Sequence, residues 1–491
     1  MQNFESILAS CSNAYSQDRV ATRLSDLAKG LLNCYGRHTV TGMLTGCGKQ
    51  FVDWSATYKA FSKNRVDIDR IFKSIVGEVI NCHPEHSFIV GHMDDTLIRK
   101  TGKKIPGTKW MRDPLGPPFH TNLVWGQRFI QVSLSLASHV TNCQSRSIPV
   151  DFHHAPSPIK PKKNPTDNEL LAYKSAQKEM KLSRQGSERI KELRDKLDTT
   201  SAKHKQLIMS VDGSYSNDEV FKNLPKRTTL IGRIRKDAKL FALPQQTETK
   251  GRKKMYGEQL PTPEQIRQDE TVAWQQVEAW AAGKSHLFNV KIVKEVKWKS
   301  AGQNKILQLI VIRPLGYRLT KGGKMLYRKP AYLLCTDNEL PIEKLLQAYL
   351  WRWEIEVNFR DQKTIMGCGK AQVRNQNSIA KLPAFTTAIY SMIHVAAYQS
   401  NLTREKNVLP KAKWDVVEKK SRLSTSEIIN LFKCELWNKQ NKYNFNDFVS
   451  SQLRSQNSRN DKINFNTAMF YARKLPKSSG LCPHKPNGLK M

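Results

Sequence analysis

The sequence has no stretch of 18 or more consecutive apolar residues, and it begins without the pattern of a secretory signal peptide. Its longest apolar stretch, residues 384–398, is short and interrupted, which is typical of a helix in a protein core. These features argue against a membrane-spanning protein. The nine cysteines include no Cys-x-x-Cys pair and no zinc-type spacing, which argues against a structural zinc site. An odd number of cysteines without a leader indicates free thiols in a reducing cytoplasm.

Acidic residues are scarce. The chain has 43 Asp plus Glu against 80 Lys plus Arg, a net charge of +37 over 491 residues. This excess indicates a polyanionic partner, and nucleic acid is the first candidate. A membrane surface is the second candidate, but the lack of long apolar segments disfavours it. Basic residues occur along the whole chain, so we expect a protein that wraps nucleic acid and not one with a single basic arm.

The length suggests about three domains, and the pattern along the chain predicts an α/β protein. Residues 1–84 are expected to be helical, as either a helix-turn-helix-like DNA-binding unit or a generic small bundle. Residues 85–245 combine apolar strands with a Pro/Lys linker at 155–165 and a charged helix at 166–200. Residues 246–329 are expected to be a β-rich insertion, residues 330–400 return to strand and helix, and residues 401–491 form a basic, partly helical end.

Two apolar strands are each expected to end at a carboxylate. One leads into Asp94 and Asp95, and the other leads into Asp212. If the strands are adjacent and parallel, their carboxyl ends meet, and ligand sites lie at such edges. A turn or N-cap role is the ordinary alternative for any single Asp. Asp95 could replace Asp94 as the ligand, but Asp94 is preferred because Asp-x-Thr then matches the Asp-Gly-Ser that starts at Asp212.

The segment YLWRWEIEVNFRDQK carries the most specific pattern. No Gly or Pro follows Pro341 up to Lys363, so residues 342–363 are expected to form one long helix. At roughly 100° per residue, Tyr349, Arg352, Glu356 and Lys363 fall within a stripe of roughly 60°. We expect a neighbouring apolar stripe to anchor this helix in the core; its members are Leu350, Trp353 and Val357. A carboxylate between two cations suits a metal ligand among phosphate-binding groups, although Arg–Glu pairs four residues apart are also common on exposed helices.

With these residues, the chain resembles the DDE transposases of bacterial cut-and-paste insertion sequences. It matches the group marked by Tyr-x2-Arg-x3-Glu-x6-Lys, here Tyr349, Arg352, Glu356 and Lys363, without departure in residue or spacing. The segments HMDDTLIRKTGKKIPG and SVDGSYS are similar to those of the family around its first and second acids. The resemblance covers roughly residues 30–400, and beyond residue 400 the chain matches only in being basic and helical.

The resemblance implies a ribonuclease-H-like catalytic core with a mixed sheet, interrupted by a β-rich insertion before the helix that carries Glu356. It implies that Asp94, Asp212 and Glu356 are catalytic and bind two Mg²⁺ ions, with Mn²⁺ as a substitute. Two such ions can stabilise the attacking and leaving oxygens of phosphoryl displacement. It also implies that the Tyr, Arg and Lys of the motif contact element-end DNA near the scissile phosphate.

Further DNA contacts are expected near these acids. Members of the group often cut through a DNA hairpin and hold a flipped base against a Trp, for which Trp298 and Trp353 are candidates; core packing is preferred for Trp353. Basic residues beside the first acid and after the second would meet phosphates or form generic basic surface; they are Lys100, Lys103, Lys104, Arg233 and Arg235.

The sequence therefore predicts a cytoplasmic, nucleoid-associated bacterial transposase. Its expected partners are double-stranded DNA, at the element ends and at the target, and a second copy of the chain in a DNA synapse. Two alternatives stay open: a catalytically inactive DNA-binding protein derived from a transposase, and a nuclease of the same fold without strand transfer.

Overall fold

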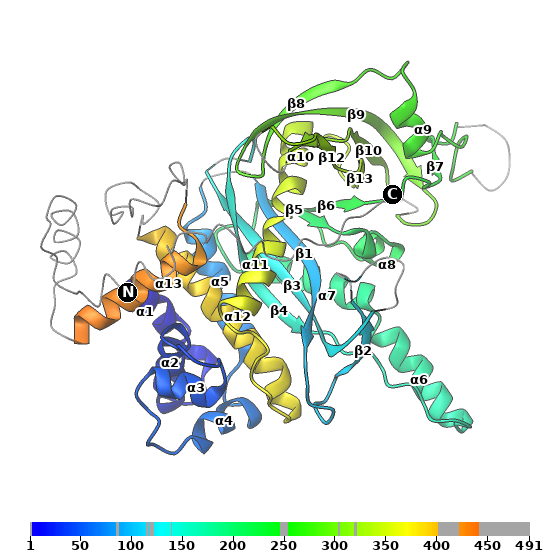
Figure 1. The fold of residues 1–491 in the computed structure, drawn as a ribbon. Helices are drawn as coiled ribbons and strands as arrows, with labels where there is room; N and C mark the ends of the chain where they lie inside the picture. Colours follow the sequence, from blue (N-terminus) through cyan, green and yellow to red (C-terminus); the bar gives the residue numbers. More distant parts are fainter. Residues whose placement is uncertain are drawn as a thin grey trace, which may run out of the picture. The chain divides into compact units, whose positions relative to one another are not determined.

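The computed structural model describes residues 2–84, 88–113, 116, 122–138, 140–245, 254–302, 305–318, 322–400 and 422–440 (Figure 1). The chain divides into two compact units. The larger is Ile7–Val395, and the smaller combines Met1–Ser6 with Ala396–Met491. The proposed ends of the helical segment, the first core segment and the insertion, at residues 84, 245 and 329, fall within the larger unit.

A mixed sheet forms the framework of the larger unit, and eleven strands contribute to it within the described ranges. They are β1 Phe88–Arg99, β2 Lys109–Arg112, β3 Leu123–Ala137, β4 Ser145–His154, β5 Gln206–Val211, β6 Thr228–Arg233, β7 Leu240–Phe241, β8 Gln275–Ala281, β9 Lys284–Trp298, β10 Leu307–Ile312 and β13 Ala331–Cys335. The order is β2-β3-β1-β5-β6-β13-β10-β9-β7, with β4 beside β3 and β8 beside β9. A separate hairpin pairs β11 Gly316–Tyr317 with β12 Leu326–Tyr327.

The centre of the sheet is parallel and both flanks are antiparallel. β1 pairs parallel with β5, and β5 pairs parallel with β6. β1 pairs antiparallel with β3, and β13 pairs antiparallel with both β6 and β10. The central β5 has the sequence QLIMSV and is buried from Leu207 onward, as expected for a strand covered on both faces.

Helices cover this sheet and form the N-terminal part of the larger unit (Figure 1). They are α2 Asp18–Leu32, α3 Val40–Gly46, α4 Ser55–Ser62, α5 Ile68–Asn81, α6 Asp167–Glu179, α7 Leu182–Asp198, α8 Asp218–Lys222, α9 Pro263–Gln268, α10 Ile342–Trp351 and α11 Glu354–Thr364. α1 Gln2–Ser10 and α12 Gln376–Gln399 each belong partly to both units, and α13 Thr425–Gln440 belongs to the smaller one. Within the smaller unit, Phe4 of α1 packs edge-to-face on Phe432 of α13, with ring centroids 5.2 Å apart.

The N-terminal helices pack at glycines. A Cβ built on Gly30 of α2 would lie 2.0 Å from the Met43 carbonyl oxygen of α3, so only glycine fits this crossing. The connection between α3 and α4 covers residues 47–54, which is longer than the three- or four-residue turn of a helix-turn-helix motif. The arrangement therefore has the expected helices without that tight turn.

Three expected elements differ from the structure. The predicted helix over residues 342–363 is two helices, α10 and α11, because the amides of Arg352 and Trp353 bond to carbonyls three residues back and tighten the turn. β1 continues to Arg99 instead of ending at Asp94, because it still pairs with β3 there. The predicted helix over residues 166–200 is also two helices, α6 and α7.

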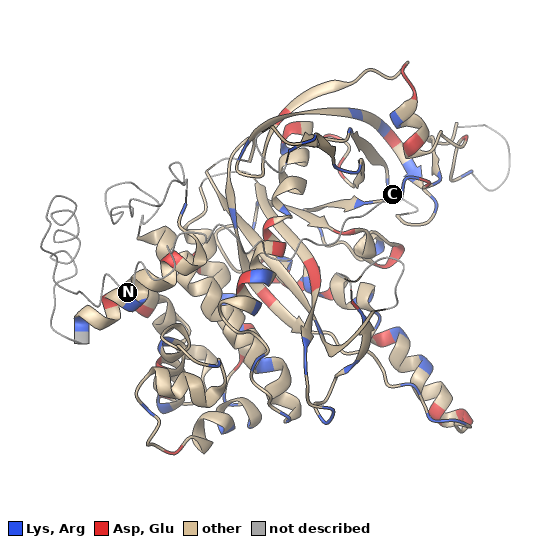
Figure 2. Ribbon diagram, in the orientation of Figure 1, with Lys and Arg blue, Asp and Glu red and all other residues tan. Residues whose placement is uncertain are grey.

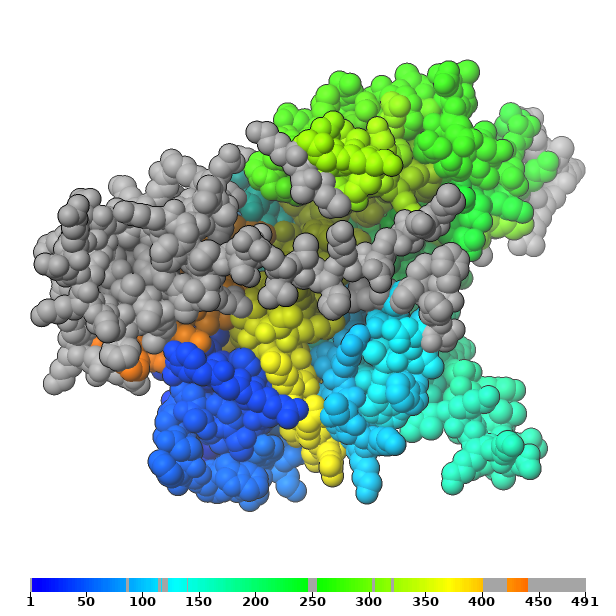
Figure 3. Space-filling view, in the orientation of Figure 1, coloured from blue at the N-terminus to red at the C-terminus, as the bar shows by residue number. Residues whose placement is uncertain are grey.

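α6 stands out from the body of the larger unit and buries none of its residues (Figure 3). Every cysteine in the described ranges is a free thiol, as expected. None of the helices in these ranges is long and apolar enough to cross a membrane. The expected basic end, residues 401–491, lies outside the described residues except for 422–440.

Candidate active site

The parallel pairing of β1 with β5 sets the positions of the first two acids. The last paired residues are Met93 and Val211, and Asp94 and Asp212 follow them directly on the two strands. Both carboxylates therefore emerge at the same edge of the parallel pair. Asp212 has the backbone position of an N-cap, but its side chain makes no capping hydrogen bond. The ordinary N-cap role therefore does not explain this carboxylate.

The helices α10 and α11 pass over this edge and contact β1 at two points. The Arg352 guanidinium donates a hydrogen bond to Asp94 Oδ2 over 2.9 Å. The Lys363 ammonium donates to the Thr96 hydroxyl over 2.6 Å. Asp94 and Thr96 are two residues apart and so lie on one face of the strand. In Figure 2, acidic and basic positions come together where α11 crosses β1.

The motif residues and the acids share one electrostatic environment. Burial lowers the pKa of Arg352, but the nearby Asp94, Tyr349, Asp212 and Glu356 raise it overall. Burial raises the pKa of the Asp94 carboxyl to about 7, Arg352 opposes this rise, and Glu356 and Asp212 add to it. The three acids and Tyr349 thus all lie within electrostatic range of Arg352. Lys363 joins them at the next turns of α11, and burial lowers its pKa.

Asp95 points into a different set of contacts. It accepts a hydrogen bond from the Tyr215 hydroxyl over 3.1 Å and forms an ion pair with Arg128 at 3.4 Å. Strand alternation places it on the face of β1 opposite to Asp94. Asp94 is thus the member of the pair that faces α10 and α11.

Buried polar contacts fix the orientation of α11. The Asn358 amide donates to the Ser147 carbonyl over 2.9 Å, and the Gln362 amide donates to Gln131 Oε1 over 2.8 Å. Both amide side chains are buried, so breaking either bond would leave polar groups without partners. These contacts hold α11 against β3 and β4 and leave Glu356 exposed on its other face.

The three acids have the donor chemistry of divalent-cation ligands. Carboxylate oxygens are the donors that Mg²⁺ prefers. The side-chain carboxylates of Asp212 and Glu356 form no hydrogen bond or ion pair with any residue that the structure describes, so their oxygens are available. Among the described residues, however, no three acidic, His or Cys side chains are close enough to hold one ion together. The chemistry of the three carboxylates fits a divalent cation, but their positions in this structure do not form a single ligand cluster.

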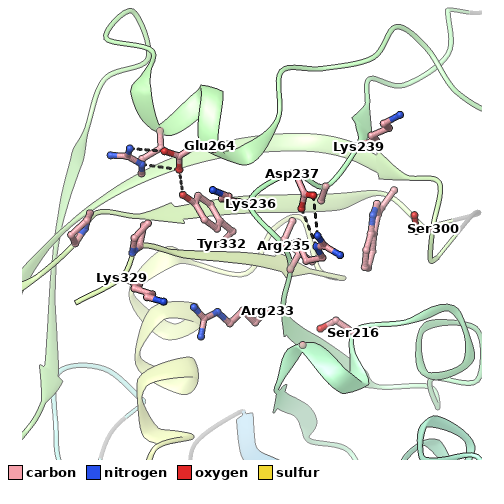
Figure 4. Close-up of a pocket in the computed structure, with 17 residues that line it drawn as sticks. Ser216, Arg233, Arg235, Lys236, Asp237, Lys239, Glu264, Ser300, Lys329 and Tyr332 are labelled. Carbon is pink, nitrogen blue, oxygen red and sulfur yellow. Dashed lines mark hydrogen bonds and ion pairs between the residues drawn. The ribbon is translucent and has the colours of Figure 1, made fainter. Parts of the chain in front are cut away.

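A second feature adjoins Asp212. A pocket of about 1110 Å³ opens beside Gly213, and Arg233, Arg235 and Trp298 all line it (Figure 4). Arg235 is paired with Asp237, which also lines the pocket. The remaining lining residues are Ser216, Ile234, Lys236, Ala238, Lys239, Glu264, Arg267, Ser300, Pro314, Lys329, Pro330 and Tyr332.

Trp298 is half-buried at the end of β9. Its ring meets Phe221 edge-to-face, with centroids 5.9 Å apart. The structure therefore brings Trp298 and Arg233 to one cavity next to the second acid. Sequence reasoning missed Lys236, Lys329 and Tyr332 in this cavity, although the basic run around Lys236 directly follows Arg233 and Arg235 and could have indicated it.

Lys100 does not have the expected exposed position. It is buried, and its ammonium donates to the backbone carbonyls of Gly369 over 2.7 Å and Ala371 over 3.2 Å. The prediction that Lys100 meets phosphate is therefore wrong in this structure: its charge is used inside the protein. Lys103 and Lys104 are exposed, as that prediction requires.

Trp353 does not have the expected position in the core. Trp353 is 61% exposed, so the prediction that it packs in the core is wrong. Trp351 is buried instead, and its indole donates to the Cys143 carbonyl over 2.8 Å. The buried side of the two helices continues through Ile355 and Phe359. Of the expected stripe, Leu350 is partly buried and packs against the core, Val357 is partly buried, and Trp353 is exposed.

Comparison with known families shows a match over more than half of the chain. The sequence model of the family described as DDE superfamily endonuclease matches residues 13–304. This range includes Asp94 and Asp212 and ends before the segment with Arg352 and Glu356. A comparison with curated proteins found no match.

Proposed function

Because the chain belongs to the DDE superfamily of endonucleases, we propose that it is a transposase that excises a DNA element and joins it to a new site. Nucleases of this superfamily generally use divalent metal ions. We assign the chain to the group with the Tyr-Arg-Glu-Lys motif, on the basis of Tyr349, Arg352, Glu356 and Lys363. The endonuclease activity follows from the family, and strand transfer is the further step of the proposal.

The strand order supports a ribonuclease-H-like core. β4, β3 and β1 form an antiparallel meander, and β5 and β6 extend it in parallel with β1. This is the order of a ribonuclease-H-like sheet, in which the first acid lies on the central strand. In this chain, that acid is Asp94.

One observation carries the proposal. The register of β1 and β5 places Asp94 and Asp212 at one edge, under the helices that bear Arg352 and Glu356. Carboxylates that could bind a metal ion and a basic side chain that could bind phosphate thus lie at one point of a basic chain. These charged residues come from four elements, β1, β5, α10 and α11. Charged residues without a shared function would not be expected to meet from four separate elements.

The residues would divide the chemistry as follows. Asp94, Asp212 and Glu356 would hold two Mg²⁺ ions, which supply charge stabilisation for the attacking and leaving oxygens of a phosphodiester. Arg352 and Lys363 would bind the non-bridging phosphate oxygens, and Tyr349 would position the strand beside them. Arg352 must release part of its contact with Asp94 when it turns toward phosphate.

The proposed reaction has two parts. Water first attacks a phosphodiester at the element end and releases a 3′-hydroxyl. That hydroxyl then attacks the opposite strand or the target DNA, so one bond forms as another breaks. The cavity beside Asp212, with Trp298 and Arg233, would hold a flipped base if the reaction passes through a hairpin.

The proposed partners are two element ends, a target duplex and a second copy of the chain. A net charge of +37 suits binding to DNA backbones, which weakens steeply as salt rises. Joining two ends requires both to be held in one complex, so a homodimer on DNA is the expected active form.

The test uses purified full-length protein, Mg²⁺, and a labelled DNA fragment that contains the native gene with its flanks. Wild type is compared with Glu356→Gln and with Glu343→Gln, a matched control at an exposed position of α10. Wild type and Glu343→Gln should nick the element ends and join them to target DNA, whereas Glu356→Gln should bind without cutting.

Each outcome separates the proposal from its alternatives. Cutting without joined products would identify a nuclease without strand transfer. Binding without cutting by all three proteins would identify a DNA-binding protein derived from a transposase. Equal cutting by wild type and Glu356→Gln would remove Glu356 from the catalytic site.

A further inference from the structure

A small hairpin stands apart from the main sheet. It lies within residues 313–329, between β10 and β13, and pairs Gly316 with Tyr327 and Tyr317 with Leu326. The Arg328 amide closes its base by donating to the Leu315 carbonyl over 3.1 Å. The hairpin is therefore held together by its own backbone hydrogen bonds and forms an arm, residues 313–329, on the β-rich segment.

The arm is basic throughout. Five cations lie within its described residues, and residues 313–329 contain no Asp or Glu. The five are Arg313, Arg318, Lys324, Arg328 and Lys329. None of them forms an ion pair with a carboxylate that the structure describes, in contrast to the Arg235–Asp237 pair of the nearby pocket. Such a surface attracts a polyanion and repels another basic protein of this kind.

Exposed apolar side chains lie among these cations. Tyr327 is 70% exposed, Met325 is 41% exposed and Tyr317 is 38% exposed. Arg328 lies over the Tyr317 ring, with its guanidinium carbon 5.5 Å from the centroid. A Cβ on Gly316 would lie 3.4 Å from the Tyr327 ring, so this ring lies against the backbone of the opposite strand of the arm. A DNA duplex presents its phosphates to the cations, but its bases are paired and stacked, so binding to a duplex backbone would not use the tyrosine rings.

The arm leads into the pocket beside the second acid. Pro314, Lys329 and Pro330, at the two ends of the arm, line that pocket together with Gly213, the neighbour of Asp212. Figure 4 shows Lys329 and Arg233 among the residues around this cavity. A DNA strand that leaves the acids through the pocket would therefore meet the arm next.

We propose that the arm of residues 313–318 and 322–329 binds unpaired DNA next to the cleavage site, with bases stacked on Tyr327 and phosphates on Lys324 and Arg328. Combined aromatic and cationic surfaces are the usual means of holding single strands. This inference rests on the proposed function, because it assumes that DNA is cut or opened at the acids.

The experiment measures binding by full-length protein in the Glu356→Gln background, so that DNA stays intact. The probes are fluorescein-labelled element-end duplexes, either blunt or with a six-nucleotide single-stranded tail. The variants are Tyr327→Ala, Tyr327→Phe and the double change Lys324→Ala with Arg328→Ala. Matched controls on the projecting α6 are Tyr173→Ala and the double change Lys174→Ala with Lys178→Ala.

Tyr327→Ala should weaken binding of tailed DNA roughly tenfold and leave blunt DNA within about twofold, because one stacking surface is lost. Tyr327→Phe keeps the ring and should bind as the parent does. The double cation variant should bind tailed DNA with a weaker salt dependence. The slope of the logarithm of the binding constant against the logarithm of the salt concentration should become shallower by roughly 0.7 for each phosphate contact that is lost. The α6 variants should match the parent protein.

Two results would overturn the inference: unchanged binding of tailed DNA by Tyr327→Ala, or equal losses for tailed and blunt DNA, which would assign the arm to duplex backbone. A parent protein that binds neither probe would instead refute the proposed function.

Discussion

The Arg352 guanidinium hydrogen-bonds to the Asp94 carboxylate over 2.9 Å, with only 13% and 14% of the two side chains exposed. The pair joins a phosphate-binding group to a cation-binding group. Removing one partner of a buried ion pair leaves the other charge uncompensated, so neither residue can be changed without affecting the other.

Cation binding should depend on pH through Asp94. Burial raises the pKa of this carboxyl to about 7, so it is about half protonated at neutral pH, and a cation must displace that proton. The apparent affinity for Mn²⁺, measured by calorimetry without DNA, should therefore rise by up to about tenfold per pH unit below pH 7 and level off above it. Affinity that stays constant from pH 5.5 to 8 would contradict this expectation.

Two tryptophans two residues apart should lose different amounts of unfolding free energy on truncation. Trp351→Ala removes a buried ring and the indole bond to Cys143, and it should lower the free energy of unfolding by about 3–5 kcal/mol. Trp353→Ala changes an exposed ring and should cost less than about 1 kcal/mol. Urea unfolding of both proteins checks this, and similar losses would mean that Trp353 is packed.

Two lysines near the first acid should separate stability from DNA binding. Lys100→Met leaves the carbonyls of Gly369 and Ala371 without their donor, and it should cost about 1–3 kcal/mol of unfolding free energy. Lys103→Met should change stability by less than about 0.5 kcal/mol and weaken DNA binding. Thermal unfolding and a DNA-binding titration on both variants provide the comparison. The reverse pattern would restore Lys100 as a phosphate contact.

Two glycines in helices should respond with opposite signs. Gly30→Ala forces a methyl group against the Met43 carbonyl and should destabilise the protein by about 1–3 kcal/mol. Gly77→Ala in α5 meets nothing within 4 Å and should stabilise it by roughly 0.5–1 kcal/mol. Chemical denaturation of the two variants tests both signs. A neutral Gly30→Ala would mean that α2 and α3 separate easily.

Sequence patterns predicted the parts of the site that depend on local order. The two apolar runs that lead into Asp94 and Asp212 were predicted to be strands, and the structure shows that these strands are adjacent and parallel. Helix periodicity predicted that the motif residues share one face of a single helix, whereas the structure has two helices there, α10 and α11. Periodicity could not predict which side of α10 and α11 is buried, because apolar residues flank the motif on both sides. The structure buries Trp351 and Ile355 and exposes Trp353.

Long-range contacts were beyond such patterns. Nothing near Lys100 indicates that its ammonium will meet the Gly369 carbonyl, 269 positions later. The pocket combines residues from 213–239 and 264–332, and sequence patterns could not predict this assembly for the same reason. The sequence predicted that Arg233 either meets phosphate or forms generic basic surface, and only the fold brings it into one pocket with Tyr332 and Trp298.

The pairing of β10 with β13 has a consequence for shortening this protein. β13 forms hydrogen bonds with β6 on one side and with β10, from the insertion, on the other. Deleting the insertion would leave β13 as an open edge strand with a buried, apolar sequence, which invites aggregation. A smaller version of the protein, or an exchange of insertions between relatives, must therefore keep β10 in register or supply another strand in its place.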